Sequence, residues 1–159
     1  MKNIWIVGVV VVVLGVLLFT TSSKQKQGAE TLDFVPGTSV ACLPSGHQNL
    51  ALHIHPTISI LVDGVAEVVP ANIGITEECM AELHTHDASG VIHLETATAG
   101  RFNQLAFKDF FAVWGMPVER EGYTLAITVN GTPVSSIDEV PLEDKAAVQF
   151  TYTSTEGAL

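Results

Sequence analysis

The sequence predicts an α+β domain that is mostly antiparallel β, either a sandwich or a β-grasp-like sheet, with one short helix and an N-terminal transmembrane helix before it. Three patterns lead to this prediction: segments in which apolar and polar residues alternate, one segment with aromatic residues at helical spacing, and an apolar N-terminal run. A strand points alternate side chains to opposite faces, whereas a helix gathers residues i, i+3, i+4 and i+7 on one side. The 159 residues suffice for one domain with a hydrophobic core.

The apolar run extends from Ile4 to Phe19 and contains no charged residue. At about 1.5 Å per residue, its length approaches the ~30 Å hydrocarbon layer of a bilayer. Lys2 precedes the run, as in a secretory signal or a signal-anchor. Because Thr21-Ser22-Ser23 is a weak cleavage site, we expect residues 1–21 to be retained as an anchor, with the domain on the extracytoplasmic side. Cleavage would instead release a secreted protein.

Two further segments follow the anchor. Residues 22–46 are polar and irregular, and they contain both proline and glycine, so we expect a linker and a lead-in. Residues 47–155 hold the alternating segments and should form the β-rich domain.

The first alternating segment runs from Leu52 to Val62, with apolar residues on one parity and polar residues on the other. This pattern predicts a half-buried strand. Pro56 has no N–H to donate, which indicates a sheet edge or a bulge at this end. Asp63-Gly64 then predicts a tight hairpin turn into a second strand, Val65–Val69.

A second hairpin is predicted from residues 81–86 and 91–95, joined by the turn Asp87-Ala88-Ser89-Gly90. A two- or four-residue loop places His84 opposite His93 and leaves the apolar residues of both strands on the other face. A three-residue loop with a bulge would move His93 to the opposite side. The hydrophobic pattern favours the first register, because the second would mix histidines with Ile92 and Leu94.

The remainder of the domain predicts one helix and three strands. Aromatic residues at positions 107, 110, 111 and 114 follow helical spacing and precede Gly115, so we expect a short amphipathic helix whose aromatic face packs on the core. Residues 123–129 alternate and lead into Asn130-Gly131, a type I′ turn signal. Residues 148–152 should form the last strand.

The charge and the cysteines of the domain restrict its partners and its compartment. From residue 27 onward, four Lys and Arg residues stand against all 17 Asp and Glu residues, a net charge of −13. Such a surface repels nucleic acid and anionic lipid and attracts cations, so we expect no nucleic-acid partner. Cys42 and Cys79 are the only cysteines, and an even pair outside the cytoplasm predicts a disulfide. Ligation of a metal by these thiolates, and free thiols, are the alternatives.

Five of the six histidines lie in two short alternating stretches. Each His-x-His motif directs two imidazoles to one face of a strand, and neutral imidazoles suit zinc(II) or copper(II). We expect a metal site built from His84, His86 and His93, joined by His53 and His55 if their strand is adjacent. Secondary candidates are Glu82, Glu95, Asp87 and His47.

The motifs HIHPTISI, PANIGI, ELHTHDASGVIHLE and FKDFFAVWG together resemble a small bacterial family of uncharacterised, membrane-anchored domains. The likeness covers about residues 52–134, and residues 83–95 match its core string LHTHDxSGxIHxE throughout. The resemblance implies an exported, anchored, histidine-rich domain. It carries over no catalytic role.

Three functions are compatible with these patterns. The leading one is a non-catalytic domain that captures, buffers or relays Cu(II) or Zn(II). The second is a structural or interaction domain whose histidines are incidental or sense pH. The third is a zinc-dependent hydrolase or hydratase in which Glu82, Glu95 or Asp87 serves as general base.

Overall fold

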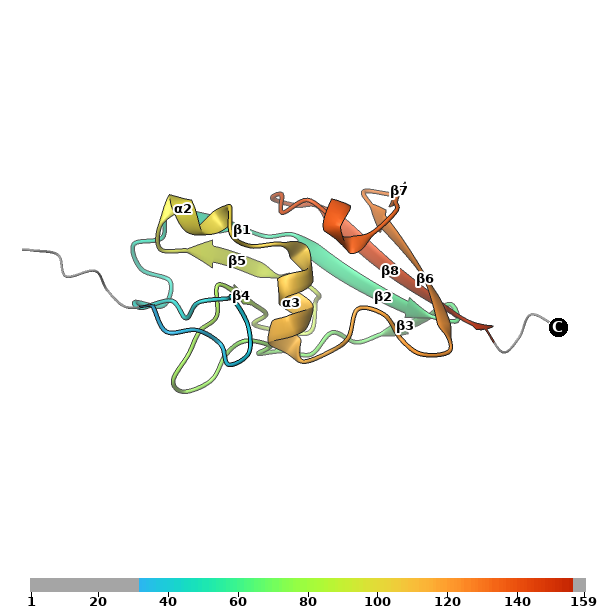
Figure 1. The fold of residues 1–159 in the computed structure, drawn as a ribbon, viewed down its shortest axis with the longest axis horizontal. Coiled ribbons are helices and arrows are strands. Elements are labelled where there is room, and N and C mark those ends of the chain that lie inside the picture. Colours follow the sequence, from blue (N-terminus) through green and yellow to red (C-terminus); the bar gives the residue numbers. More distant parts are fainter. Residues whose placement is uncertain (1–31, 156–159) are drawn as a thin grey trace, which may run out of the picture. The chain divides into compact units, whose positions relative to one another are not determined.

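The computed structural model describes residues 32–155 of the chain, and the expected transmembrane helix lies outside these residues. The described part is mostly β, with two sheets and short helices, which confirms the predicted β-rich domain (Figure 1). Within residues 32–155, no helix has the length and hydropathy needed to cross a bilayer.

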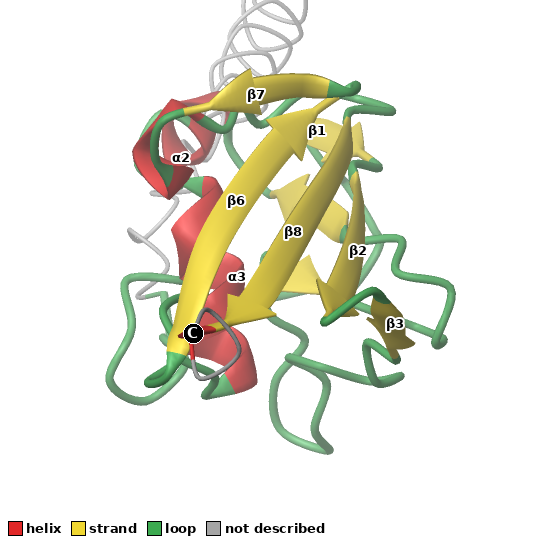
Figure 2. Ribbon diagram, turned by 90° about the vertical axis from the view of Figure 1, so that its right-hand side faces the viewer, coloured by secondary structure: helices red, strands yellow, loops and turns green. Residues whose placement is uncertain are grey.

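The larger sheet is mixed and has five strands in the order β3-β2-β8-β6-β7 (Figure 2). Strand β8 pairs in parallel with β2 and antiparallel with β6. Each edge strand forms an antiparallel hairpin with its inner neighbour. The strands are β2 (Thr57–Val62), β3 (Val65–Glu67), β6 (Tyr123–Val129), β7 (Thr132–Val134) and β8 (Ala147–Ser154).

The two hairpin turns of this sheet have the conformation that their sequences predict. Asp63 and Gly64 have φ of 49° and 81°, and Asn130 and Gly131 have φ of 50° and 79°. A type I′ turn requires positive φ at both central residues, which explains why Asp-Gly and Asn-Gly occupy these positions.

The smaller sheet has three antiparallel strands in the order β1-β5-β4: β1 (Leu52–Ile54), β5 (His93–Thr96) and β4 (Leu83–His84). The strand predicted over Leu52–Val62 is therefore divided. Its first part, β1, ends at Ile54 in the smaller sheet, and its second part, β2, begins at Thr57 in the larger sheet. Pro56 lies at this break, where a residue without an N–H costs no ladder hydrogen bond.

Helix α3 (Phe107–Trp114) confirms the predicted amphipathic helix and lies against the larger sheet (Figure 2). Three of its four aromatic side chains are buried, and the rings of Phe107 and Phe111 pack on Phe150 of β8. Gly115 ends the helix with φ of 74°. The sequence did not predict the single turn of α2 (Ala99–Phe102) or the 3₁₀ turn η1 (Ile137–Glu139).

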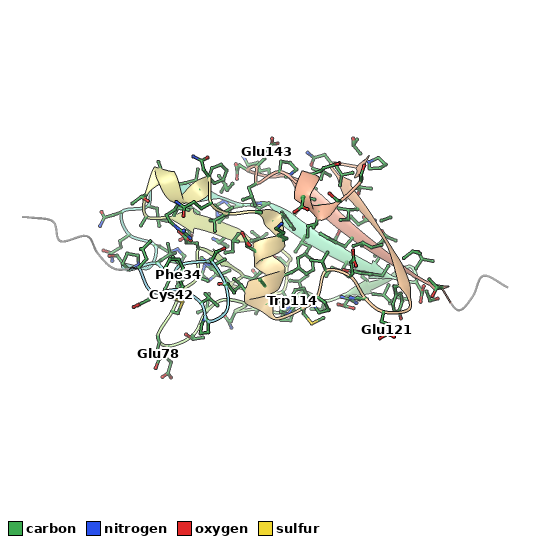
Figure 3. The ribbon with its side chains drawn as sticks, viewed as in Figure 1. Phe34, Cys42, Glu78, Trp114, Glu121 and Glu143 are labelled. Carbon is green, nitrogen blue, oxygen red and sulfur yellow. A yellow bond between two sulfur atoms is a disulfide. The ribbon has the colours of Figure 1, made fainter. Side chains whose placement is uncertain are left out.

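The segment expected to be a lead-in packs into the domain. Val40, Ala41 and Leu43 are buried, and the Leu43 N–H donates to the Met80 carbonyl over 2.7 Å. A disulfide joins Cys42 to Cys79. Beside it, a cavity is lined by residues that include Phe34, Cys42 and Glu78, which are labelled in Figure 3. The packed region thus begins upstream of residue 47, where the sequence placed the start of the domain.

Candidate metal centre

All six histidines of the chain lie together, and three of them contact the buried carboxylate of Glu95. They come from two stretches that are distant in sequence, residues 47–55 and residues 84–93, and many of their rings lie close together, with centroids 4.4–6.4 Å apart. The set consists of His47, His53, His55, His84, His86 and His93.

The smaller sheet supplies the centre of this group. His84 on β4 pairs directly with His93 on β5, which confirms the predicted register. Leu83 and Leu94 form the adjacent pair, and both side chains are buried in the core. The hairpin is shorter than predicted, because regular pairing ends at His84 and His93. Residues 85–92 form a connection whose Val91 pairs with Thr57 instead.

Strand β1 brings the second His-x-His motif beside the first. His53 is the pairing partner of Glu95 on β5, so its imidazole lies next to those of the hairpin. His55 follows the end of β1, and its backbone N–H donates to Asp144 Oδ1 over 2.9 Å. The rings of His53 and His55 lie 4.4 Å apart. This adjacency is what the sequence left open.

His47 reaches the group from the residue position that directly follows the lead-in. The disulfide and the backbone hydrogen bonds between residues 41–43 and residues 80–82 fix this segment beside β4. Its Nδ1 lies 2.9 Å from both carboxylate oxygens of Glu95. From the sequence, His47 was only a secondary candidate, because this histidine lies in an irregular segment. The signal that could have found it is the equal five-residue spacing from Cys42 to His47 and from Cys79 to His84, because a disulfide between these cysteines brings the two histidine segments together.

Glu95 is fully buried, and its carboxylate faces imidazoles of three segments. Besides the contact with His47, its Oε1 lies 2.9 Å from His53 Nε2 and 3.5 Å from His93 Nδ1. Burying a carboxylate is costly unless it is hydrogen-bonded and its charge is compensated. The position of Glu95 therefore favours positive charge in this group, from protonated imidazole or from a bound cation.

His84 is oriented as a metal ligand. Its Nδ1 lies 2.8 Å from the carbonyl oxygen of Ala81, which can only accept, so Nδ1 carries the proton. Nε2 is then the free acceptor, and it lies 3.2 Å from Nε2 of His86. Two nitrogens bound to one tetrahedral zinc at 2.0–2.1 Å lie about 3.3 Å apart. Histidines that bind metals usually donate their other N–H in this way.

Burial and the charges of neighbouring imidazoles lower the pKa of two of these histidines and so favour their neutral form. Burial lowers the pKa of His84 to about 4, although its hydrogen bond to Ala81 opposes the shift. Burial also lowers the pKa of His93, and the nearby rings of His86 and His55 lower it further. Neutral imidazoles are the form that binds metals.

Three groups of side chains bring a ligand atom from each member within 4.8 Å of the others. We call His47, His84 and His86 trio A, and His53, His55 and His93 trio B. The third group consists of His84, His93 and Glu95. Trio A and trio B are open to solvent, because His47, His53 and His86 are exposed, whereas His84 and Glu95 of the third group are buried.

Two of the secondary candidates lie elsewhere. Glu82 is buried, and its carboxylate accepts hydrogen bonds from Arg101 and from the backbone N–H of Ala41, so we correct its expected role as a ligand. Asp87 is exposed and accepts the Ser89 N–H over 2.9 Å, which makes it a turn residue. Hydrogen bonds from Ser89 also lower the pKa of Asp87. Of the three candidate acids, only Glu95 joins the histidines.

Comparisons with known proteins leave the site to be interpreted from its own geometry. No protein-family model, no curated protein and no solved structure matches the chain.

Proposed function

We propose that this chain is a membrane-anchored, extracytoplasmic domain that binds copper(II) or zinc(II) through its histidines and captures or relays the ion. One observation carries the proposal: all six histidines of the chain converge, and each belongs to a group whose ligand atoms lie within 4.8 Å of one another. Imidazole nitrogen is a preferred ligand of both metals, and the geometry favours neither.

The surroundings of the site support capture and relay rather than storage in a closed cage. His47, His53 and His55 each expose two fifths or more of their side chains, so an ion has direct access from solvent. The acidic surface of the domain attracts cations toward it. The proposed location outside the cytoplasm is supported by the N-terminal apolar run and by the disulfide, since disulfides persist in oxidising compartments.

We also propose that the larger sheet and α3 form a β-grasp-like fold. The larger sheet consists of two hairpins that flank a central strand, β8, with β8 parallel to β2 and with α3 between the hairpins in sequence. This order supports a β-grasp-like arrangement over a sandwich, with the smaller sheet and its histidines as an addition to it.

The zinc-hydrolase alternative receives less support. It requires a general base beside the ion. Glu82 is bound to Arg101 and Asp87 stabilises its turn, which leaves Glu95. Glu95 already faces three imidazoles, so it is placed to hold ligands or ions rather than a water molecule.

The proposal is tested by the metal content of the full-length chain in detergent. The protein is loaded separately with copper(II) and zinc(II), dialysed, and analysed by plasma mass spectrometry. We expect retained metal in the natural sequence and a large loss in His84→Ala/His86→Ala. Glu121→Gln serves as control, because this exposed acid lies at the far end of the view from Cys42 and β4 (Figure 3). Negligible metal in all three proteins would contradict the proposal and favour the structural or pH-sensing alternative.

A further inference from the structure

The six histidines divide without remainder into trio A and trio B. The third group, which contains Glu95, takes His84 from trio A and His93 from trio B. Because Nδ1 of His84 donates to Ala81, only its Nε2 is free, and His84 can serve one ion only. A central ion, with two histidine ligands and a carboxylate, therefore excludes an ion in trio A, whereas trio A and trio B share no residue and can each hold an ion with three histidines.

We propose that the cluster is a binuclear centre that holds two copper(II) or zinc(II) ions side by side, one in each trio, with Glu95 between them. This inference rests on the proposed function and specifies its stoichiometry. The centre would bind a pair of divalent ions through imidazole ligands, and every histidine of the chain would be a ligand in it.

The angles between the rings favour the two-ion mode. A ring nitrogen binds a metal along its lone pair, which lies in the plane of the ring, so an ion must lie near the plane of each ring that holds it. His84 and His93 are stacked with an interplanar angle of 20°, and stacked rings are poorly suited to share one ion. Steep angles occur inside each trio, 84° between His84 and His86 and 88° between His55 and His93, and also at the boundary between the trios, 82° between His86 and His93. Such pairs can direct their lone pairs to a common point.

The two trios are close enough for their ions to interact. The rings of His86 in trio A and His93 in trio B have centroids 4.4 Å apart. Two divalent ions at such close range repel each other, and paired-ion sites need negative charge to offset this.

Glu95 is placed to supply that charge. Its carboxylate contacts His47 of trio A and His53 of trio B, each over 2.9 Å. It is fully buried, and among the described residues its ion-pair partners are imidazoles rather than lysine or arginine. Without bound ions, the buried charge of Glu95 is poorly compensated. When two cations occupy the trios, their positive charge compensates this carboxylate, which touches both trios.

The test counts ions per folded chain in variants that each disable one trio. His47→Asn/His86→Asn removes two exposed ligands of trio A, and His53→Asn/His55→Asn removes one exposed and one partly exposed ligand of trio B. Both variants keep the buried His84, and circular dichroism verifies their folding. Glu121→Gln is again the control. The full-length proteins in detergent are titrated with copper(II), counted by mass spectrometry, and examined by electron paramagnetic resonance.

We expect two ions in the natural sequence and in the control, and one ion in each double variant. The resonance spectrum should show coupling between the two copper ions in the natural sequence, and an isolated ion in each variant. One ion in the natural sequence would overturn the binuclear centre and retain the proposed function. Loss of both ions from either variant, or two ions in both variants, would overturn the assignment to trios. No bound ion in any protein would overturn the proposed function itself.

Discussion

The Nδ1–H of His84 donates to the carbonyl oxygen of Ala81 over 2.8 Å, and this hydrogen bond fixes which nitrogen of a buried imidazole faces His86. The carbonyl belongs to the residue three positions earlier, just before β4. The segment that leads into this strand therefore orients the ligand that the strand carries. A ligand held in this way needs little reorganisation to bind an ion.

The substitution His84→Asn separates this hydrogen bond from metal binding. The asparagine amide can donate to Ala81 from nearly the position of Nδ1, but it has no group at the position of Nε2. We expect a folded protein whose copper(II) or zinc(II) affinity falls by more than the roughly 10–100-fold that loss of a ligand's hydrogen-bond partner usually costs. Competition against a chelator of known affinity measures the change. Unchanged affinity would remove His84 from the site.

The stability of the metal-free protein should fall on acidification between pH 6.5 and pH 4. The pKa of His84 is about 4 in the folded state against 6.5 as a free group, because burial disfavours its charged form. The unfolded chain therefore binds more protons in this window, and folding is progressively destabilised as pH falls through it. A shift of this size corresponds to about 3 kcal/mol, with no further loss from this group below pH 4.

Denaturant unfolding at pH 7, 5.5 and 4, with chelator present, measures this dependence. His84→Asn is the matched variant, because it keeps the donor to Ala81 and removes the titrating group. As pH falls, the unfolding free energy of the natural sequence should decrease relative to that of His84→Asn. A difference that is constant with pH would contradict the prediction.

The ion pair of Glu82 and Arg101 should support the fold without contributing to metal binding. Both side chains are buried, and Glu82 also accepts the Ala41 N–H. Arg101→Met would leave a buried carboxylate unpaired, which typically costs about 3–5 kcal/mol. The double variant Glu82→Met/Arg101→Met should recover much of this loss. Metal content per folded chain should stay unchanged in both variants, and a decrease in the double variant would return Glu82 to the list of ligands.

The disulfide should stabilise the domain and position His47. It closes a loop with a sequence separation of 37 residues, for which loop entropy predicts a contribution of up to about 4 kcal/mol. Cys42→Ser/Cys79→Ser should therefore unfold at lower denaturant concentration. Because His47 follows Cys42 by five residues, the variant should also bind the ion of trio A more weakly than the ion of trio B. Equal weakening at both trios would indicate a general loss of structure.

Local patterns in the sequence predicted the hairpin that carries the site, but not the neighbours of that hairpin. The alternation of Leu83 and Leu94 with His84 and His93 allows one register with a buried apolar face, and the structure has that register. Glu95 follows from the same alternation. Glu82 shares this parity, yet its carboxylate is taken by Arg101 on α2, a single turn with no clear periodic signal.

The remaining members depend on contacts between distant segments. β1 pairs with β5 across about 40 residues, and nothing in the His-x-His motif specifies that partner. The break at Pro56, which lets the chain pass from one sheet to the other, appears in the sequence only as a strand irregularity. His47 has no periodic pattern at all, and it is positioned by a disulfide and by hydrogen bonds to residues 80–82.

Gly90 closes the connection between His86 and His93, and its replacement should disturb both the fold and the site. Its φ is +82°, and a Cβ atom there would lie 2.2 Å from the carbonyl oxygen of Ile58, part of the backbone of β2. Gly90 also accepts the Ile58 N–H over 2.8 Å. Gly122→Ala is the matched control, because Gly122 has φ of +80° and open space around it. It reports the cost of positive φ alone, about 1 kcal/mol.

We expect Gly90→Ala to be destabilised more than Gly122→Ala, because the β2 backbone cannot move aside as a flexible side chain could. The connection must shift instead, which moves His86 of trio A relative to His93 of trio B. Chemical denaturation measures the first effect, and the electron paramagnetic resonance spectrum of the copper-loaded protein measures the second. Equal stability of the two variants, with an unchanged copper spectrum, would show that this connection does not set the spacing of the two trios.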